Sequence, residues 1–338
     1  MKNDIKRVLK PKKTLRFSVT SALSGLKKFL TILIVFILLI FFNCYTDSSA
    51  PSNQITPGEL SRSLTSAEMK LLDSGEVFGF KLLKKMVEQQ PDSNIFISPL
   101  SILMALGMTY NGAETTTLDA MHQTLEYGDL TRQEVNESGK GLITLLSEID
   151  PRVDFDLANS IWYRNDYPVL QEFIDVNENY YDAVVDDLDF SNDTAADTMN
   201  MWVSENTNGL IEEIIEAPID PMTVMFLINT IYFKGTWTYE FDPENTYETN
   251  FLSVNNNQTS CQMMCLEGDL PYFKNELFQA VDLQYGNLAF SMTVLLPKSE
   301  YSVDDIIDQL NQENWNIWRN SFSTEEMELC LLDVSVGP

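Results

Sequence analysis

Apolar residues recur along the chain beyond about residue 60 with two periods, one of three to four residues and one of two. The longer period predicts an amphipathic helix that stops at Gln90, because Pro91 disfavours helical backbone in the residue before it. A second helix, from about Pro99 to Gly112, is apolar nearly all round, so we expect it to be buried. A third ends at Asn208-Gly209, a pair suited to a left-handed helix stop. The apolar face of the first helix consists of Val77, Phe80, Leu83 and Val87.

Short runs rich in β-branched and aromatic residues alternate with these helices and predict strands. One such run is Asn94 to Ile97, and residues 153–164 alternate apolar with acidic positions before becoming apolar. Residues 222–233, MTVMFLINTIYF, are apolar almost throughout, which predicts a central strand covered on both faces. Residues 290–297 predict another such strand. This mixture of helices and strands indicates an α+β fold, with one extended domain from about residue 60 onward.

The first 44 residues have the composition of an export signal. Nine lysines and arginines and a single acid accompany an apolar run from Phe29 to Phe42. As a helix, that run spans about 21 Å, less than the ~30 Å hydrocarbon core of a bilayer. A secretory signal peptide over 1–44 therefore fits better than a membrane span. The residues from 45 to 65 are rich in Ser, Pro, Asn and Thr and predict a flexible tether.

Cys44 stands where a bacterial lipoprotein signal is cut and its new N-terminal cysteine is acylated. We therefore expect Cys44 to be a lipidation site, and the protein to be an exported lipoprotein of the cell envelope, held to the membrane by its lipid. The alternatives are an ordinary signal peptide, which gives a secreted protein, or an uncleaved membrane anchor, with Cys44 incidental in both.

The charge of the remaining chain excludes one class of partner. Residues 45–338 hold 13 basic and 49 acidic residues, a net charge of −36. Such a surface repels phosphate backbones, so nucleic-acid binding is not expected. The simplest interpretation is a solvated, soluble surface.

The cysteines beyond the leader are Cys261, Cys265 and Cys330. An odd, widely spread set is not a disulfide framework, and on an extended strand the first two lie about 13 Å apart, beyond the reach of a bridge. A C-x-x-x-C pair with no neighbouring histidine is also a poor zinc signal. We therefore expect buried free thiols and no metal site.

Catalytic groups are few in this sequence. Its single histidine, His122, lies in a predicted helix, where a packed or surface role is expected rather than that of a base. The sequence has no glycine-rich phosphate loop and no second histidine for a metal pair. Carboxylates are plentiful, but no pattern singles out an acid–base pair. We expect neither an enzyme nor a bound cofactor.

Four segments, in matching order, resemble one family. These are NIFISPLSILMALGMTYNGAETTTLDAMHQTL, NMWVSENTNGLI, LINTIYFKGTWTYEFDPENTYETNF and MTVLLPKSEYSVDDIIDQL. They are similar to the second helix with its lead-in strand, the helix across the main sheet, the central third strand and a later strand-to-helix passage of serpins. The chain is identified as a bacterial member of the serpin family. The resemblance implies a serpin-like α+β fold, a multi-helix domain over 66–338 with three β-sheets.

The resemblance also implies roles for four residues. In serpins the strand that carries Asn229 borders a gap in the main sheet, and Trp237 corresponds to the tryptophan where that gap first opens. Ser98 and Ser101 would lie beneath the sheet and form a polar cluster with Asn229 that re-forms after the strands separate. The residues alone support simpler interpretations, with Ser98 as a helix N-cap, Asn229 as a satisfied core amide and Trp237 as core filler.

The function implied by the resemblance is inhibition of a serine protease, or alternatively of a cysteine protease, by conformational trapping. A protease attacks an exposed loop, forms an acyl-enzyme, and the cut loop inserts into the main sheet as an added strand. A monomer is expected. The alternative is a non-inhibitory binding or structural protein of the cell envelope on the same scaffold.

The end of the sequence departs from the family pattern. The chain stops at Pro338, in MELCLLDVSVGP, where a serpin would begin a further strand. We therefore expect a domain that is incomplete at its C-terminus and lacks the reactive loop, either as an inactive fragment of a longer product or through a lost reading frame. The scissile bond stays unknown.

Overall fold

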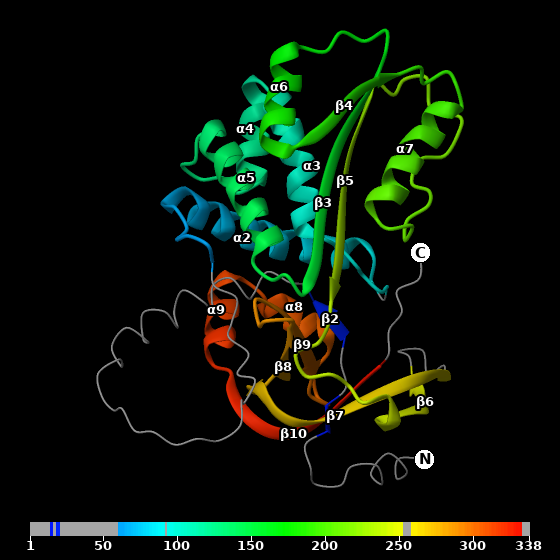
Figure 1. The fold of residues 1–338 in the computed structure, drawn as a ribbon. Coiled ribbons are helices and arrows are strands. Elements are labelled where there is room, and N and C mark those ends of the chain that lie inside the picture. The colour runs from blue at the N-terminus through cyan, green and yellow to red at the C-terminus, as the bar shows by residue number, and fades with distance from the viewer. Residues whose placement is uncertain (1–13, 16–17, 21–59, 92, 253–257, 333–338) are drawn as a thin grey trace, which may run out of the picture. The chain divides into compact units, whose positions relative to one another are not determined.

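The computed structural model describes residues 14–15, 18–20, 60–91, 93–252 and 258–332 (Figure 1). The apolar run 29–42, Cys44 and residues 45–59 of the predicted tether lie outside them. None of the helices in the described ranges is long and apolar enough to cross a membrane. Two compact units are present. We call Leu60–Ile149 with Asp154–Lys234 the helical unit, and Asp150–Val153 with Gly235 onward and the N-terminal strands the sheet unit.

The helices of the helical unit begin and end where their capping residues dictate. Thr65 and Thr131 each accept a hydrogen bond from the backbone of a glutamate three residues later, and that glutamate bonds back to the cap. Asn208 and Gly209 have φ values of 52° and 77°, which confirms the predicted left-handed stop. The helices are α2 (Ser66–Gln89), α3 (Pro99–Gly112), α4 (Thr115–Thr124), α5 (Arg132–Glu148), α6 (Gln171–Tyr181) and α7 (Thr194–Asn206).

The packing of α2 and α3 differs in part from the prediction. The residues of α2 in the core cluster around Leu125 and Tyr127 are Phe78 and, partly buried, Ala67, Leu71 and Leu82. The predicted apolar face, with Val77, Phe80, Leu83 and Val87, is only half-buried. The burial predicted for α3 is confirmed, because that helix contributes residues to two separate core clusters.

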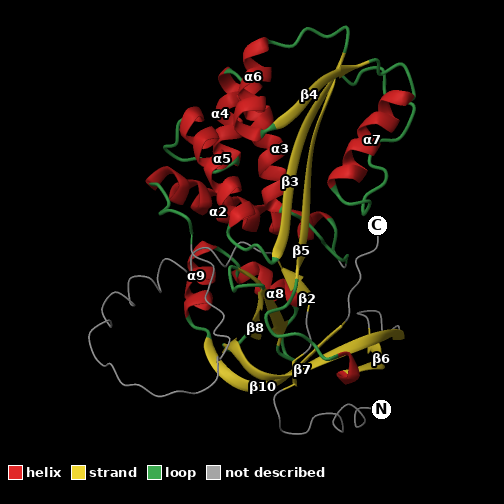
Figure 2. Cartoon of the chain, viewed as in Figure 1, coloured by secondary structure: helices red, strands yellow, loops and turns green. Residues whose placement is uncertain are grey.

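A three-stranded sheet runs through the helical unit in the order β4 (Ala183–Leu188), β3 (Val153–Arg164), β5 (Met225–Gly235). Figure 2 shows α7 on one side of this sheet and α3 and α6 on the other. The α7 side buries Met199 and Val203 of the helix against Trp162 and Ile228. The opposite side buries α3 and α6 against Ile161 and Ala183. Alternate residues of each strand therefore face two different cores.

Two strand predictions need correction. Among the described residues β5 is an edge strand, paired with β3 alone, and not the central strand that its apolar run predicted. Apolar content reports that both faces are covered, as they are here by α7 and α3, but carries no information on how many neighbours a strand has. Residues 94–97 form no strand, because no described strand pairs with them, and Phe96 is 79% exposed.

The sheet unit contains one sheet of seven strands, in the order β1-β10-β7-β8-β9-β2, with β6 also paired to β7. β7 is 17 residues long; it pairs with β6 over residues 258–264, with β10 over residues 263–272 and with β8 over residues 272–274. The described residues therefore form two sheets where three were expected, because β7 runs unbroken from one set of neighbours to the next. The strands are β1 (Thr14–Leu15), β2 (Ser18–Thr20), β6 (Thr246–Leu252), β7 (Gln258–Lys274), β8 (Phe278–Tyr285), β9 (Phe290–Pro297) and β10 (Ser323–Leu332). Short helices η3 (Pro243–Asn245), α8 (Val303–Gln309) and α9 (Gln312–Asn320) also belong to this unit.

The central position predicted for 290–297 is confirmed, since β9 lies between β8 and β2.

The expectation that the cysteines are all free thiols is wrong for two of them. Cys265 and Cys330 form a disulfide, and Cys261 is free. The antiparallel register of β7 and β10 places Cys265 directly opposite Cys330, with 4.2 Å between their Cα atoms. The distance along one strand separates Cys261 from Cys265, but it cannot show that Cys330, on another strand, lies opposite Cys265.

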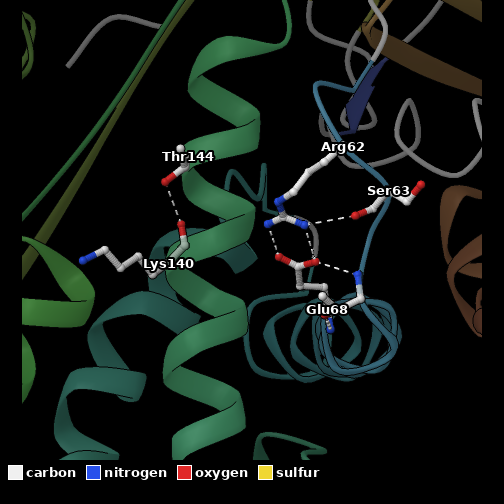
Figure 3. Close-up of polar contacts among 6 residues, drawn as sticks. Arg62, Ser63, Glu68, Lys140 and Thr144 are labelled. Atoms are coloured by element: carbon white, nitrogen blue, oxygen red, sulfur yellow. Dashed lines mark hydrogen bonds and ion pairs between the residues drawn. The ribbon is translucent and has the colours of Figure 1, made fainter.

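An ion pair fixes the start of α2 (Figure 3). Both Nη atoms of Arg62 donate to the carboxylate of Glu68, at 2.5 and 2.8 Å, and Glu68 also accepts from the backbone N–H of Thr65. Glu68 is 2% exposed and lies against Gly141 of α5. Arg62, inside the predicted tether of 45–65, is therefore bound to the folded helical unit.

Candidate functional site

The amide of Asn229 links the edge strand β5 to its neighbours on the α3 side of the sheet. Ser101 Oγ on α3 donates a hydrogen bond to Asn229 Oδ1. Asn229 Nδ2 donates to Asn159 Oδ1 on β3 at 2.8 Å. The Asn229 side chain thus accepts a hydrogen bond from helix α3 through its oxygen and donates one to the adjacent strand β3 through its nitrogen. The resemblance predicted the contact between Ser101 and Asn229, and the structure has it.

Asn159 continues this polar chain and was not predicted from the sequence. It is 1% exposed, and its Nδ2 donates to the backbone oxygen of Tyr181 at the end of α6, at 2.7 Å. The signal was present in the alternation of β3, because Asn159 shares a face with Leu157 and Ile161, both in the α3-side core. A polar residue at an inward position of a strand requires a buried partner.

Ser98 reaches this cluster only through Ser101. Its Oγ accepts a hydrogen bond from the backbone N–H of Ser101 at 3.2 Å and caps α3, as the simpler interpretation of this residue predicted. The polar cluster of the helical unit therefore consists of Ser101, Asn229 and Asn159, with Ser98 holding the first turn of α3 beneath them.

Trp237 belongs to the sheet unit. Its ring stacks on Tyr285, with centroids 4.2 Å apart, and makes an edge contact with Phe241. It packs against the core cluster formed by β7, β8, β9 and β10. Burial raises the pKa of Tyr285 to about 12, so its ring stays neutral beneath the indole. Trp237 covers the edge of this core, which agrees with its interpretation as core filler; the role implied by the resemblance stays a prediction.

The chemistry of the cluster is that of a reversible hydrogen-bonded link. Its groups are amides and hydroxyls, which neither titrate near neutral pH nor act as strong nucleophiles without an adjacent base. His122 lies elsewhere in the helical unit. Both of its ring nitrogens are engaged, Nδ1 with Tyr110 Oη at 2.8 Å and Nε2 with the Gly128 carbonyl at 3.0 Å, which agrees with the packed role expected for it.

Replacing Asn229 with alanine is expected to lower the free energy of unfolding by about 1–3 kcal/mol, because Asn159 and Ser101 each lose a buried partner. Chemical denaturation measures the change. The Ser101→Ala variant and the double variant complete a cycle, in which the two effects should be less than additive. Strict additivity would mean that the bond between these two side chains contributes nothing to stability.

Comparison with known proteins identifies the family. Residues 73–335 match the family described as Serpin (serine protease inhibitor). An uncharacterized serpin-like protein of Methanosarcina acetivorans is 30% identical over 260 residues, 76% of this chain and 60% of the relative. Human neuroserpin is 29% identical over 250 residues, 71% of this chain and 61% of the relative. The chain thus spans about three fifths of the length of these relatives.

The fold comparison agrees with the sequence match. The thermophilic serpin tengpin, solved in its latent state, superposes with a TM-score of 0.72 at 26% identity, over 80% of this chain and 72% of that one. The chain therefore belongs to the serpin family and has its fold of mixed helices and sheets. The description of the matched family names an inhibitor of proteases and not an enzyme.

Proposed function

We propose that the intact form of this protein inhibits a serine protease, or alternatively a cysteine protease, as a suicide substrate that traps the enzyme by a conformational change. The family match over 73–335 supports inhibition in general. The observation that carries the trapping mechanism is the position of β5, a strand covered on both faces whose outer edge has no partner among the described strands.

An edge strand presents unpaired N–H and C=O groups, which can pair with an added strand. β5 is already held on its inner edge by β3 and beneath by Ser101 of α3. The inserted segment would be the cut loop of the inhibitor itself, still joined to the protease by an ester. The free energy for the change comes from the new ladder of hydrogen bonds and buried side chains.

We expect the intact protein to form a complex with its target serine protease that survives denaturing electrophoresis, because the trapped species is covalent. Protein cut in its loop should also melt at a higher temperature than uncut protein, since insertion adds a strand. Gel electrophoresis and calorimetry measure the two effects. Asn229→Ala is the control: it should alter the melting behaviour but leave attack on the loop possible, because no chemistry is assigned to that residue.

Plain digestion, with no covalent species and no rise in melting temperature, would contradict inhibition. The protein would then be a non-inhibitory binding or structural protein of the envelope on the serpin scaffold. Small residues in the hinge of the loop favour insertion, whereas bulky or proline-rich ones oppose it, so the composition of that segment separates the two functions independently.

We further propose that the protein is exported as a monomer and held to the cell envelope by a lipid on Cys44. Metabolic labelling with a fatty acid should mark the protein, and Cys44→Ala should abolish the label. Label that persists in the variant would contradict lipidation at this residue, and cleavage of the leader without any label would indicate plain secretion.

A further inference from the structure

Two cross-strand pairs of unusual composition follow each other on one face of the sheet unit. Cys265 on β7 lies opposite Cys330 on β10; Glu267, two residues after Cys265, lies opposite Glu328, two residues before Cys330. Side chains two residues apart share a face of a strand, so the two sulfurs and two carboxylates form consecutive pairs. Carboxylates directly opposite each other destabilise a sheet, which makes this pairing unexpected as a purely structural arrangement.

The sulfurs and one carboxylate converge. The two Sγ atoms and a carboxylate oxygen of Glu328 all lie within 4.8 Å of one another. Both cysteines are more than nine-tenths buried, at 8% and 3% exposed, whereas Glu328 is half-buried. A cavity of about 650 Å³ opens beside Cys265, lined also by Glu267 and Glu328. The remaining cavity residues include Glu240, Asp242, Glu244 and Tyr247, so that its wall is strongly acidic.

We propose that Cys265, Cys330 and Glu328 form a site for a zinc ion when the disulfide is reduced, and that the disulfide closes this site. Two thiolates and a carboxylate are three ligands of the kinds that zinc prefers, and the cavity leaves room for water as the fourth. Glu267, opposite Glu328, adds negative charge beside the ion. In the oxidised protein both sulfurs are bonded to each other and neither is available as a thiolate ligand.

The chemistry of opening and filling the site balances with a dithiol as reductant. The dithiol transfers two electrons and two protons, the bond between the sulfurs breaks, two cysteine thiols form, and the dithiol leaves as its cyclic disulfide. Each thiol then releases its proton to solvent as its sulfur binds the ion. A small disulfide reverses the sequence: it takes two electrons from the two thiolates and two protons from solvent, leaves as two thiols, and the metal is released as the bond between the sulfurs forms. The amount of bound zinc would therefore report whether Cys265 and Cys330 are reduced or joined in the disulfide.

The test is zinc binding by the full chain in detergent, with Cys44 replaced by serine so that the leader contributes no thiol. After reduction by a dithiol and its removal without air, one zinc ion should bind per chain, and the oxidised protein should bind none. Cobalt offered in place of zinc should give the intense near-ultraviolet absorption of thiolate-to-metal charge transfer. Adding Cys330→Ser should remove both the bound ion and this absorption.

Matched variants separate this site from other thiols and acids. Cys261→Ser alters the third cysteine of the folded part and should keep the bound zinc. Glu328→Gln should weaken binding and leave the disulfide able to form, whereas Glu326→Gln, two residues earlier on the same strand, should not. Circular dichroism verifies that each variant is folded. The proposal is wrong if reduced protein binds no more zinc than the Cys330→Ser variant, or if Glu326→Gln weakens binding as much as Glu328→Gln.

Discussion

Replacing Cys330 with serine is expected to lower the free energy of unfolding of the sheet unit by about 4 kcal/mol under non-reducing conditions. The disulfide joins residues 65 apart, and closing a loop of this length removes conformational entropy of that order from the unfolded chain. The bridge also connects β7 to β10, whose pairing extends over ten residues of each strand. Its loss should therefore weaken the sheet as a whole. The midpoint of denaturation by urea measures the change.

Two comparisons make this result specific to the bridge. Cys261→Ser, four residues before Cys265 on the same strand, should change the midpoint little, since Cys261 is free. The double variant Cys265→Ser/Cys330→Ser should lose no more than about the single variant, because either change removes the whole bond. If treatment with a dithiol leaves the midpoint of the unaltered protein unchanged, the bridge contributes nothing to stability.

The local pattern of the sequence predicted most elements, because their boundaries depend on neighbouring residues. Pro91 and Asn208-Gly209 stop helices through backbone geometry alone, and both ends were predicted correctly. The alternation of 153–164 predicted β3 in full. Such features need no knowledge of distant segments.

What could not be predicted depends on which strands become neighbours. The position of β5 at a sheet edge, the lack of a strand at 94–97 and the bridge between Cys265 and Cys330 are all properties of pairing between distant segments. An apolar run indicates that both faces of a strand are covered, and the spacing of cysteines along the chain concerns a single strand. Neither shows which strands become neighbours. Register, which placed the two cysteines opposite each other, is visible only once the strands are paired.

In the candidate site, too, local features could be predicted from the sequence and contacts between distant segments could not. Ser101 and Asn229 are 128 residues apart, and only the family resemblance brought them together before the structure did. Asn159 was missed because the apolar half of β3 was interpreted as uniform, although its inward position required a polar partner. Ser98 has the capping role that its place before Pro99 predicts from local chemistry.

Replacing Gly141 with alanine is expected to destabilise the helical unit by about 1–3 kcal/mol, although alanine normally favours a helix by about 1 kcal/mol over glycine. A Cβ atom at this position of α5 would overlap the Glu68 carboxylate and lie 2.8 Å from Arg62 Nη2. Glu68 is held from two sides, by Arg62 and by the Thr65 backbone, and cannot move away without losing both. Gly139→Ala, in the same helix, meets no atom within 4 Å and should instead stabilise the unit by about 1 kcal/mol.

The stability of the Arg62→Ala variant as a function of pH shows how much the ion pair between Arg62 and Glu68 stabilises the helical unit. The hydrogen bond from Arg62 lowers the pKa of Glu68 below its ordinary value of 4.5. Its contribution to stability is therefore complete above that value and is lost as the pH falls through the lowered pKa of the folded state. Arg62→Ala should destabilise the unit at pH 7, and the difference from the unaltered protein should shrink below about pH 4.5. Because Gly141→Ala acts through packing as well, part of its loss of stability should persist in acid. If Gly141→Ala and Gly139→Ala change the stability equally at every pH, α5 and the start of α2 do not approach as closely as described.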